Sequence, residues 1–283
     1  MELSDIHEIR GLLSRHGFSF DKRLGQNFLI DPDVCPHMAD EAIPGPEYGV
    51  LEIGPGIGVL TVELARRAAK VVSVELDDRL FPILEETLAG FDNVHLVHGD
   101  VLKLDLAALL AEEFPGMPVV VCANLPYYIT SPVIMKLLGS SLPVESLTVM
   151  VQAEAADRLC AEVGTRAAGA VTVAIRFYAE AEQLFFVPKE SFLPAPKVNS
   201  EVIRLTLRDK PAAVLDSEDA FFGMVKGAFG QRRKTIVNSL SAGLSLDKAA
   251  VKALLKSLDI PPTARIEQLS LEDLLRIYQA SRN

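Results

Sequence analysis

Short apolar runs alternate with longer amphipathic segments through the first half of the chain. The runs are about five residues long and rich in β-branched residues, as expected of buried strands. They cover residues 49–53, 70–75, 93–97, 118–122 and 145–151. Segments with helical spacing lie between them, for example at 58–68, 78–89 and 130–138. Because such alternation is typical of βαβ units with right-handed crossovers, it predicts a doubly wound α/β domain with a mostly parallel sheet.

The pattern changes in the second half. Residues 170–178 suit either a strand or a buried helix, and apolar runs follow at 183–187 and 202–207. Beyond about residue 210 the spacing is helical only, and the expected helices cover 218–229, 232–240, 247–257 and 270–280. Asp216 and Ser270 lie in the expected N-cap regions of the first and last of these. The pattern predicts two domains, 1–209 and 210–283.

Composition adds constraints. With 49% hydrophobic and 23% charged residues, the chain can form a sizeable core. Its net charge of −10 argues against a nucleic-acid partner if the charge is evenly spread. Cys35, Cys122 and Cys160 are far apart and odd in number, and the histidines form no metal signature, so we expect no disulfide and no metal. The absence of a leader-like or membrane-length apolar stretch favours a cytoplasmic protein.

A glycine-rich loop follows the first strand of the predicted sheet. In LEIGPGIG, Gly54, Gly56 and Gly58 permit close approach of a ligand to the backbone, although a tight βα turn would use the same residues. The dinucleotide fingerprint would need glycine where Val59 stands, and no G-K-[ST] follows. Neither standard nucleotide motif is therefore complete.

Carboxylates follow the glycine loop at successive strand ends. Glu52 precedes the loop, Glu75 ends the second strand, and Asp100 follows the third. A carboxylate in the position of Glu75 can accept hydrogen bonds from both ribose hydroxyls. Each acid alone could be a solvated strand end, but together they predict an adenosine-type ligand, which NAD would also satisfy. The pattern resembles S-adenosylmethionine-dependent class I methyltransferases.

The fourth strand ends in the sequence Asn124-Leu125-Pro126-Tyr127. The exocyclic amine of adenine is a poor nucleophile because its lone pair is delocalised into the ring. An amide oxygen and a neighbouring carbonyl that accept its two N–H bonds favour a pyramidal nitrogen, and a tyrosine ring can stack on the base. An Asx/Pro turn is the structural alternative. Because the tetrad lies at the end of the fourth strand, where such folds bind ligands, we favour a functional role for it.

The tetrad N-L-P-Y resembles the rRNA adenine dimethyltransferase family, as do RLGQNFLID at 23–31 and SFLPAPKVNS at 191–200. The resemblance implies that Phe192 stacks on a flipped adenine opposite Tyr127. It implies S-adenosylmethionine as cofactor, held by Asn27, Leu29, Gly54, Gly56, Glu75, Asp100 and Asn124. The implied catalytic set is Asn124, Leu125, Pro126, Tyr127 and Phe192.

Within that family, AFGQRRKTIVNSL at 228–240 and the leucine of N-L-P-Y resemble the small-subunit branch. The resemblance implies an enzyme that dimethylates two adjacent adenosines in the 3′-terminal hairpin of 16S rRNA during ribosome biogenesis, and we expect it to be a monomer. Residues 1–209 would be catalytic, and 210–283 would bind RNA or the ribosome. Ala153 and Ala168 depart from the lysine and tyrosine usual in the family.

Cations gather at two places in this acidic chain. Arg232, Arg233 and Lys234 stand at an expected helix start, and Arg23 lies in the N-terminal stretch. Each cluster could be merely solvated, but beside an RNA-modifying domain we expect phosphate contacts. Two other functions stay open: a nicotinamide-dependent oxidoreductase, and a non-enzymatic RNA-binding assembly factor. The intact Glu75, Asp100 and Asn124 favour catalysis over the latter.

Overall fold

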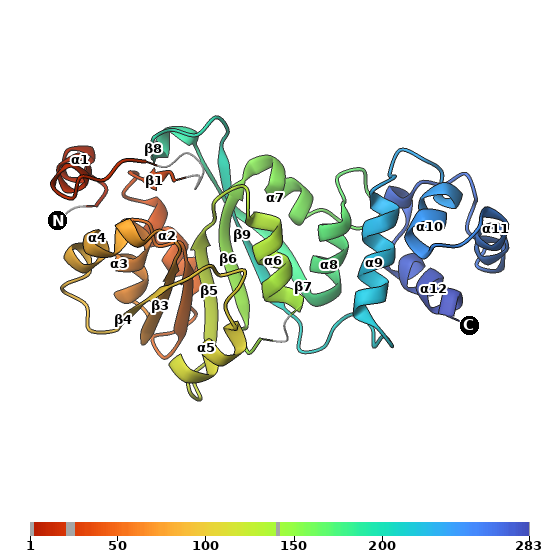
Figure 1. Cartoon of the computed structure of the whole chain (residues 1–283), viewed down its shortest axis with the longest axis horizontal. Coiled ribbons are helices and arrows are strands. Elements are labelled where there is room, and N and C mark those ends of the chain that lie inside the picture. Colours follow the sequence, from red (N-terminus) through yellow and green to blue (C-terminus); the bar gives the residue numbers. More distant parts are fainter. Residues whose placement is uncertain (1–2, 21–25, 140–141, 283) are drawn as a thin grey trace. The chain divides into compact units, whose positions relative to one another are not determined.

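The computed structural model of the chain describes residues 3–20, 26–139 and 142–282 (Figure 1). Contacts divide the chain into two compact units. The first, here called the sheet unit, contains Met1–Ala156 and Glu182–Leu207; the second, the helical unit, contains Asp157–Ala181 and Arg208–Asn283. The chain passes from the sheet unit to the helical unit for the last time between Leu207 and Arg208, two residues before the boundary expected at 209/210. Residues 157–181, which the sequence pattern placed in the first domain, belong to the helical unit.

Seven strands form the main sheet, in the order β4-β3-β2-β5-β6-β9-β7. Neighbours from β4 to β6 are parallel, and β9 is antiparallel to β6. The strands are β2 (Gly49–Ile53), β3 (Lys70–Glu75), β4 (Val94–His98), β5 (Val119–Asn124), β6 (Ser146–Gln152), β7 (Ala179–Val187) and β9 (Ser200–Leu207). The five strands expected in the first half are confirmed, with ends displaced by at most two residues.

The order of the strands determines where a ligand can bind. The chain runs outward from β2 to β4, returns to β5 on the other side of β2, and continues to β6 (Figure 1). Ligands of doubly wound folds bind at such a reversal, outside the carboxyl ends of the strands. A separate two-stranded sheet pairs β1 (Phe28–Leu29) with β8 (Phe192–Leu193) in antiparallel fashion.

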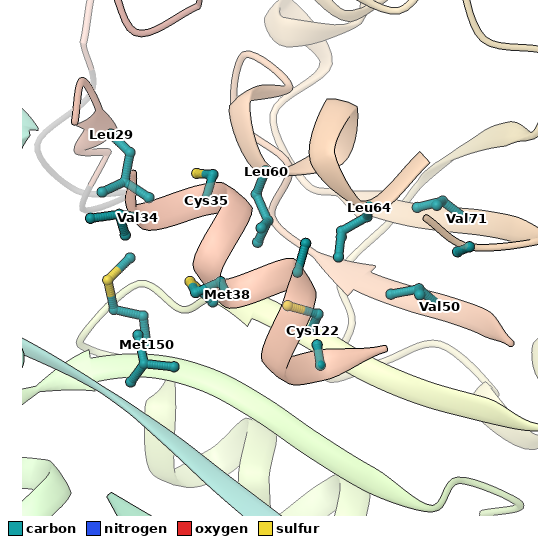
Figure 2. Packing of buried hydrophobic residues seen from close by; sticks show 14 of the residues in the cluster. Leu29, Val34, Cys35, Met38, Val50, Leu60, Leu64, Val71, Cys122 and Met150 are labelled. Atoms are coloured by element: carbon teal, nitrogen blue, oxygen red, sulfur yellow. The ribbon is translucent and has the colours of Figure 1, made fainter. Parts of the chain in front are cut away.

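The helices up to residue 159 are α1 (Ile6–Arg15), α2 (Val34–Ala42), α3 (Val59–Ala65), α4 (Phe81–Thr87), α5 (Leu106–Glu113), α6 (Thr130–Gly139) and α7 (Ala153–Leu159). Figure 2 shows how α2 and α3 cover one face of the main sheet. Cys35 and Met38 of α2 belong to one buried cluster with Val50, Cys122 and Met150 from three neighbouring strands. Since side chains alternate between faces along a strand, Glu52 shares this face with Val50.

The helical unit contains α8 (Ala170–Tyr178), α9 (Glu218–Phe229), α10 (Ile236–Leu244), α11 (Lys248–Ser257) and α12 (Leu271–Arg282). Residues 170–178, which the pattern left ambiguous, are helical and contribute Val173 and Phe177 to the core of this unit. Ser270 is confirmed at the start of α12, where its hydroxyl and Asp273 exchange hydrogen bonds with each other's backbone N–H. The N-cap of α9 is Ser217, one residue beyond Asp216.

The helix expected over 232–240 begins later, at Ile236. Residues 230–234 instead form tight turns, in which the Lys234 N–H donates to the Gln231 carbonyl at 2.8 Å. The cations therefore precede α10 rather than occupy its first turn. Over the described parts of the chain, no helix combines the length and the apolar character needed to cross a membrane.

Candidate active site

The strand ends of the sheet unit border a single cleft, here called the strand-end cleft. Its lining comes from the N-terminal segment, the carboxyl ends of β2 to β5 and strand β8. The lining includes Gln26, Asn27, Phe28, Leu29, Gly54, Gly56, Glu75, Leu76, Asp100, Asn124, Leu125, Pro126, Tyr127, Tyr128 and Phe192. All residues expected to hold the cofactor or the adenine thus line one cleft, although they come from six separate stretches of sequence.

The glycine loop forms the floor of this cleft at the end of β2. Gly54, Gly56 and Gly58 have φ angles of +70°, +61° and +91°, in the left-handed region that favours glycine. A Cβ added to Gly54 would meet no atom within 4 Å, because the loop borders open space there. A Cβ on Gly56 would lie 3.2 Å from the Phe28 ring, so the loop also packs against the N-terminal segment.

Glu75 ends β3 beside the glycine loop and is largely buried. Its Oε1 accepts hydrogen bonds from the N–H groups of Leu76 and Asp77, each at 2.9 Å. Its Oε2 accepts one longer bond of 3.3 Å from the Gly56 N–H. Burial raises the pKa of this carboxyl group, and the three N–H donors oppose that rise. A carboxylate has about four acceptor positions, so Oε2 retains capacity for a ligand hydroxyl.

Asp100 follows β4 and is held by its own loop. Its Oδ1 accepts from the Leu102 N–H at 3.0 Å. Lys136 of α6 fixes the same loop from the other side, because its Nζ donates to the carbonyls of Leu102 and Leu104 at 2.8 and 2.7 Å. The sequence pattern gave no reason to connect Lys136 with Asp100, since 36 positions separate them.

Asn124 is the last residue of β5 and is half-buried in the cleft wall. The turn that follows is anchored by Leu125, whose buried side chain and whose N–H bond to the Met150 carbonyl at 3.3 Å attach it to β6. Tyr127 lines the cleft, and its hydroxyl is 2.8 Å from the Ser200 Oγ. Partial burial raises the pKa of Tyr127, so its hydroxyl is neutral at physiological pH.

The two-stranded sheet supplies another wall of the cleft. Leu29 pairs with Phe192 and Phe28 with Leu193, so residues 28–29 and 192–193 of the two expected family segments form neighbouring strands. Phe192 lines the cleft and is otherwise buried in the core cluster, to which Leu29 also belongs. The two aromatic residues expected to stack on the base, Tyr127 and Phe192, thus share the same cleft.

Glu52 lies beneath the glycine loop and is almost fully buried. Its Oε2 accepts hydrogen bonds from Thr61 of α3 at 2.8 Å and from Ser73 of β3 at 2.6 Å. Its Oε1 is buried without a hydrogen-bond partner among the described residues. Desolvation raises the pKa of this carboxyl group to about 7, in spite of the two hydroxyl donors. Glu52 therefore joins the elements on both sides of the loop without lining the cleft.

This buried carboxyl group makes stability depend on pH. Its pKa rises from the ordinary 4.5 to about 7 in the folded chain, so the native state retains a proton that the unfolded chain releases within that window. The stabilising contribution is complete below the lower value and is lost as pH rises to the upper one. Relative to Glu52→Gln, the wild type should lose about 3 kcal/mol of unfolding free energy across this range. Urea denaturation at both ends measures the difference; parallel profiles for the two proteins would contradict the assignment.

The cations expected to face RNA differ in their surroundings. Arg232 forms an ion pair of 2.8 Å with the mostly buried Glu267, and its Nη2 also donates to the Arg166 carbonyl at 2.7 Å. Arg232 therefore has a structural role within the helical unit. Arg233 and Lys234 are exposed. Arg23 lies outside the described residues.

A model of the family described as "Ribosomal RNA adenine dimethylase" matches residues 17–282. The chain belongs to this family. Proteins named "Ribosomal RNA small subunit methyltransferase A" are among the curated relatives of this adenine dimethylase. The protein of Geobacillus kaustophilus is 48% identical over 273 residues, 95% of this chain and 93% of the relative. That of Bacillus cytotoxicus is 45% identical over 283 residues, with 99% and 97% covered.

Solved structures of similar proteins agree with the family assignment. The 23S rRNA methyltransferase ErmE is 30% identical, with a TM-score of 0.67, and the match covers 90% of this dimethylase and all of that chain. A dimethyladenosine transferase from Plasmodium falciparum is 26% identical, with a TM-score of 0.72 and coverage of 88% and 95%. The predicted class I methyltransferase fold and rRNA adenine dimethyltransferase activity are confirmed, and the oxidoreductase alternative is set aside.

Proposed function

We propose that this dimethylase uses S-adenosylmethionine to dimethylate two adjacent adenosines in the 3′-terminal hairpin of 16S rRNA, as a cytoplasmic monomer acting during ribosome assembly. The observation that carries the proposal is the convergence of Asn124 and Tyr127 with Glu75 and Asp100 on the strand-end cleft. The choice of the small subunit is supported by the names and the 45–48% identity of the bacterial relatives, against 30% for the 23S enzyme.

The cleft has the donor and acceptor set that S-adenosylmethionine requires. Gly54 leaves room for the ligand against the loop, and Glu75 Oε2 has acceptor capacity for a ribose hydroxyl. Asp100, in its braced loop, offers a carboxylate acceptor for the adenine amine, and Asn27 lines the cleft from the N-terminal segment. When bound, the cofactor supplies a methyl group attached to a positively charged sulfur.

The residues at the end of β5 and in the turn after it then orient the target amine. The Asn124 amide oxygen and a backbone carbonyl of the following turn accept its two N–H bonds, which favours a pyramidal nitrogen whose lone pair points at the methyl group. Tyr127 stacks on the base, with its hydroxyl held by Ser200, and Phe192, which lines the same cleft, provides the second ring. The methylated amine is acidic enough to release its proton to water, so this arrangement needs no side chain as general base.

The charge is divided unevenly between the two units. The sheet unit has 26 acidic and 13 basic side chains, whereas the helical unit has 12 acidic and 15 basic ones. The sheet unit, which contains the cofactor residues, therefore has a net charge of −13, and the helical unit has one of +3. We infer that the helical unit makes the phosphate contacts, with Arg233 and Lys234 among the contributors.

Replacing Arg233 and Lys234 by glutamine should weaken RNA binding and flatten its salt dependence. Each lost phosphate contact should reduce the slope of log K against log salt concentration by about 0.7 to 0.9. Arg66, an exposed cation ion-paired with Glu63 in the sheet unit, gives the matched control. Filter-binding titrations at several salt concentrations measure the slope. An unchanged slope in the double variant would remove Arg233 and Lys234 from the interface.

Arg232→Ala should instead lower the unfolding temperature, because it leaves Glu267 unpaired. Thermal unfolding of the variant and the wild type measures this effect.

Methyl transfer to ribosomal particles tests the proposed substrate. We expect radiolabel from S-adenosylmethionine to enter small subunits that lack the modification, and not large subunits. Small subunits that are already modified provide the matched control and should accept no label. Transfer to large subunits alone would contradict the proposed substrate.

A further inference from the structure

Asp77 lies two residues beyond Glu75 and links the end of β3 to the N-terminal segment. Its side chain is only 4% exposed. Its Oδ2 accepts a hydrogen bond from Gln26 Nε2 at 2.7 Å, and Gln26 lines the strand-end cleft beside Asn27. This contact joins positions 51 residues apart in the sequence. The Asp77 carboxylate itself does not line the cleft, so any influence on a ligand passes through its neighbours.

Arg79 completes the contact from the other side. Its Nε and Nη2 donate to the two Asp77 oxygens at 2.8 and 2.6 Å, a bidentate arrangement. Its guanidinium group also lies 5.1 Å from the centre of the Phe18 ring. The Phe18 and Phe20 rings in turn lie 6.2 and 5.2 Å from Phe28, which lines the cleft. The N-terminal segment is thus attached to the end of β3 by polar and aromatic contacts.

The backbone of Asp77 contacts Glu75, on the other side from Gln26. Its N–H donates to Glu75 Oε1 at 2.9 Å, so one residue contacts the expected ribose acceptor and, through its side chain, Gln26. Hydrogen bonds from Arg79 hold the pKa of Asp77 below its ordinary value, and the carboxylate is therefore ionised throughout the neutral range. An ionised acceptor makes the stronger hydrogen bond to the Gln26 amide.

We propose that Asp77, supported by Arg79, is a positioning residue for cofactor binding, which holds Gln26 and the N-terminal wall of the strand-end cleft in the binding geometry. This inference rests on the proposed cofactor site, but it concerns two residues that do not line the cleft. Loss of the Asp77 side chain removes its hydrogen bond to the Gln26 amide, and the wall of the cleft becomes less ordered. The change should appear in cofactor affinity and not in the transfer step.

A double-mutant cycle between Gln26 and Asp77 tests the inference, with S-adenosylhomocysteine as the calorimetric probe. Asp77→Ala should raise Kd about tenfold, the effect of losing a hydrogen bond to a charged group. If Asp77 acts through Gln26, the double alanine variant should bind no more weakly than Gln26→Ala alone. Asp78→Asn, which removes the neighbouring exposed carboxylate, is the control and should bind like the wild type.

A second variant separates positioning from folding. Asp77→Asn retains an oxygen that can accept from Gln26 but loses the ion pair with Arg79, so its Kd should lie between those of wild type and Asp77→Ala. Methyl transfer should show a raised KM for the cofactor and an unchanged kcat in both variants. Additive effects in the cycle, an unchanged Kd in Asp77→Ala, or a lowered kcat with unchanged KM would overturn the inference. Failure of the wild type to bind the probe would instead overturn the proposed cofactor site.

Discussion

Asn124→Ala is expected to reduce methyl transfer by about a hundredfold to a thousandfold, the cost typical of removing one preorganised hydrogen-bonding group from an active site. The side chain ends β5 in the cleft wall, where its amide oxygen can accept from the target amine. Without this acceptor the amine stays planar and its lone pair stays delocalised. Cofactor affinity should remain within about tenfold of wild type, because the loss amounts to one neutral hydrogen bond at most.

Companion variants show whether the acceptor oxygen is responsible. Asn124→Asp keeps an oxygen at the same position and should retain more activity than the alanine variant. Asn238→Ala removes an asparagine of α10 that bonds to Thr235 in the helical unit, and it should transfer methyl groups at the normal rate. Single-turnover kinetics with saturating RNA measure the transfer step. Near-wild-type turnover in Asn124→Ala would end the amine-positioning role.

Glu75→Ala should weaken cofactor binding by about thirtyfold to a thousandfold. The carboxylate is the acceptor proposed for the ribose hydroxyls, and hydrogen bonds to a charged group contribute about 1.5 to 3 kcal/mol each. Its Oε1 also holds the N–H groups of Leu76 and Asp77, so the loss loosens the cleft wall as well. Calorimetric titration with S-adenosylmethionine gives the affinity.

The Glu75 experiment needs controls for charge and for folding. Glu85→Ala removes an exposed carboxylate from α4 and should leave the affinity unchanged. Glu75→Gln keeps the shape and one acceptor oxygen, so it should bind more weakly than wild type and more tightly than the alanine variant. Thermal unfolding shows whether each variant is folded at the titration temperature. An unchanged affinity in a folded Glu75→Ala protein would remove the ribose assignment.

Local pattern was sufficient to predict the sheet and most of the cleft. Runs such as GVLEI and KVVSVE are buried at nearly every position, so their composition reflects a strand covered on both faces. Parallel strands present their carboxyl ends at one edge, which is why Glu75, Asp100 and Asn124 meet although they are distant in sequence. Phe192 and Leu29 came from the family resemblance alone, since nothing local indicates that their short strands pair.

Other features depend on long-range contacts and could not be read from the sequence. The pairing of Arg232 with Glu267 gives a structural role to a residue expected to contact RNA, and it joins positions 35 residues apart. The contacts of Asp77 with Gln26 and of Lys136 with the Asp100 loop are of the same kind. The raised pKa of Glu52 arises from its burial in the folded chain, and burial of a single carboxyl group cannot be predicted from a sequence motif.

The identity of the product tests the central claim most directly. After reaction with unmodified small subunits, the 16S rRNA can be digested to nucleosides and fragments and analysed by mass spectrometry. We expect N6,N6-dimethyladenosine at two adjacent positions of the 3′-terminal hairpin with the wild-type protein. After the same short reaction, Asn124→Ala should give about a hundredfold to a thousandfold less of it. Methyl groups on a ring nitrogen, on a ring carbon or on the ribose would contradict a cleft that presents the exocyclic amine of adenine to the methyl group.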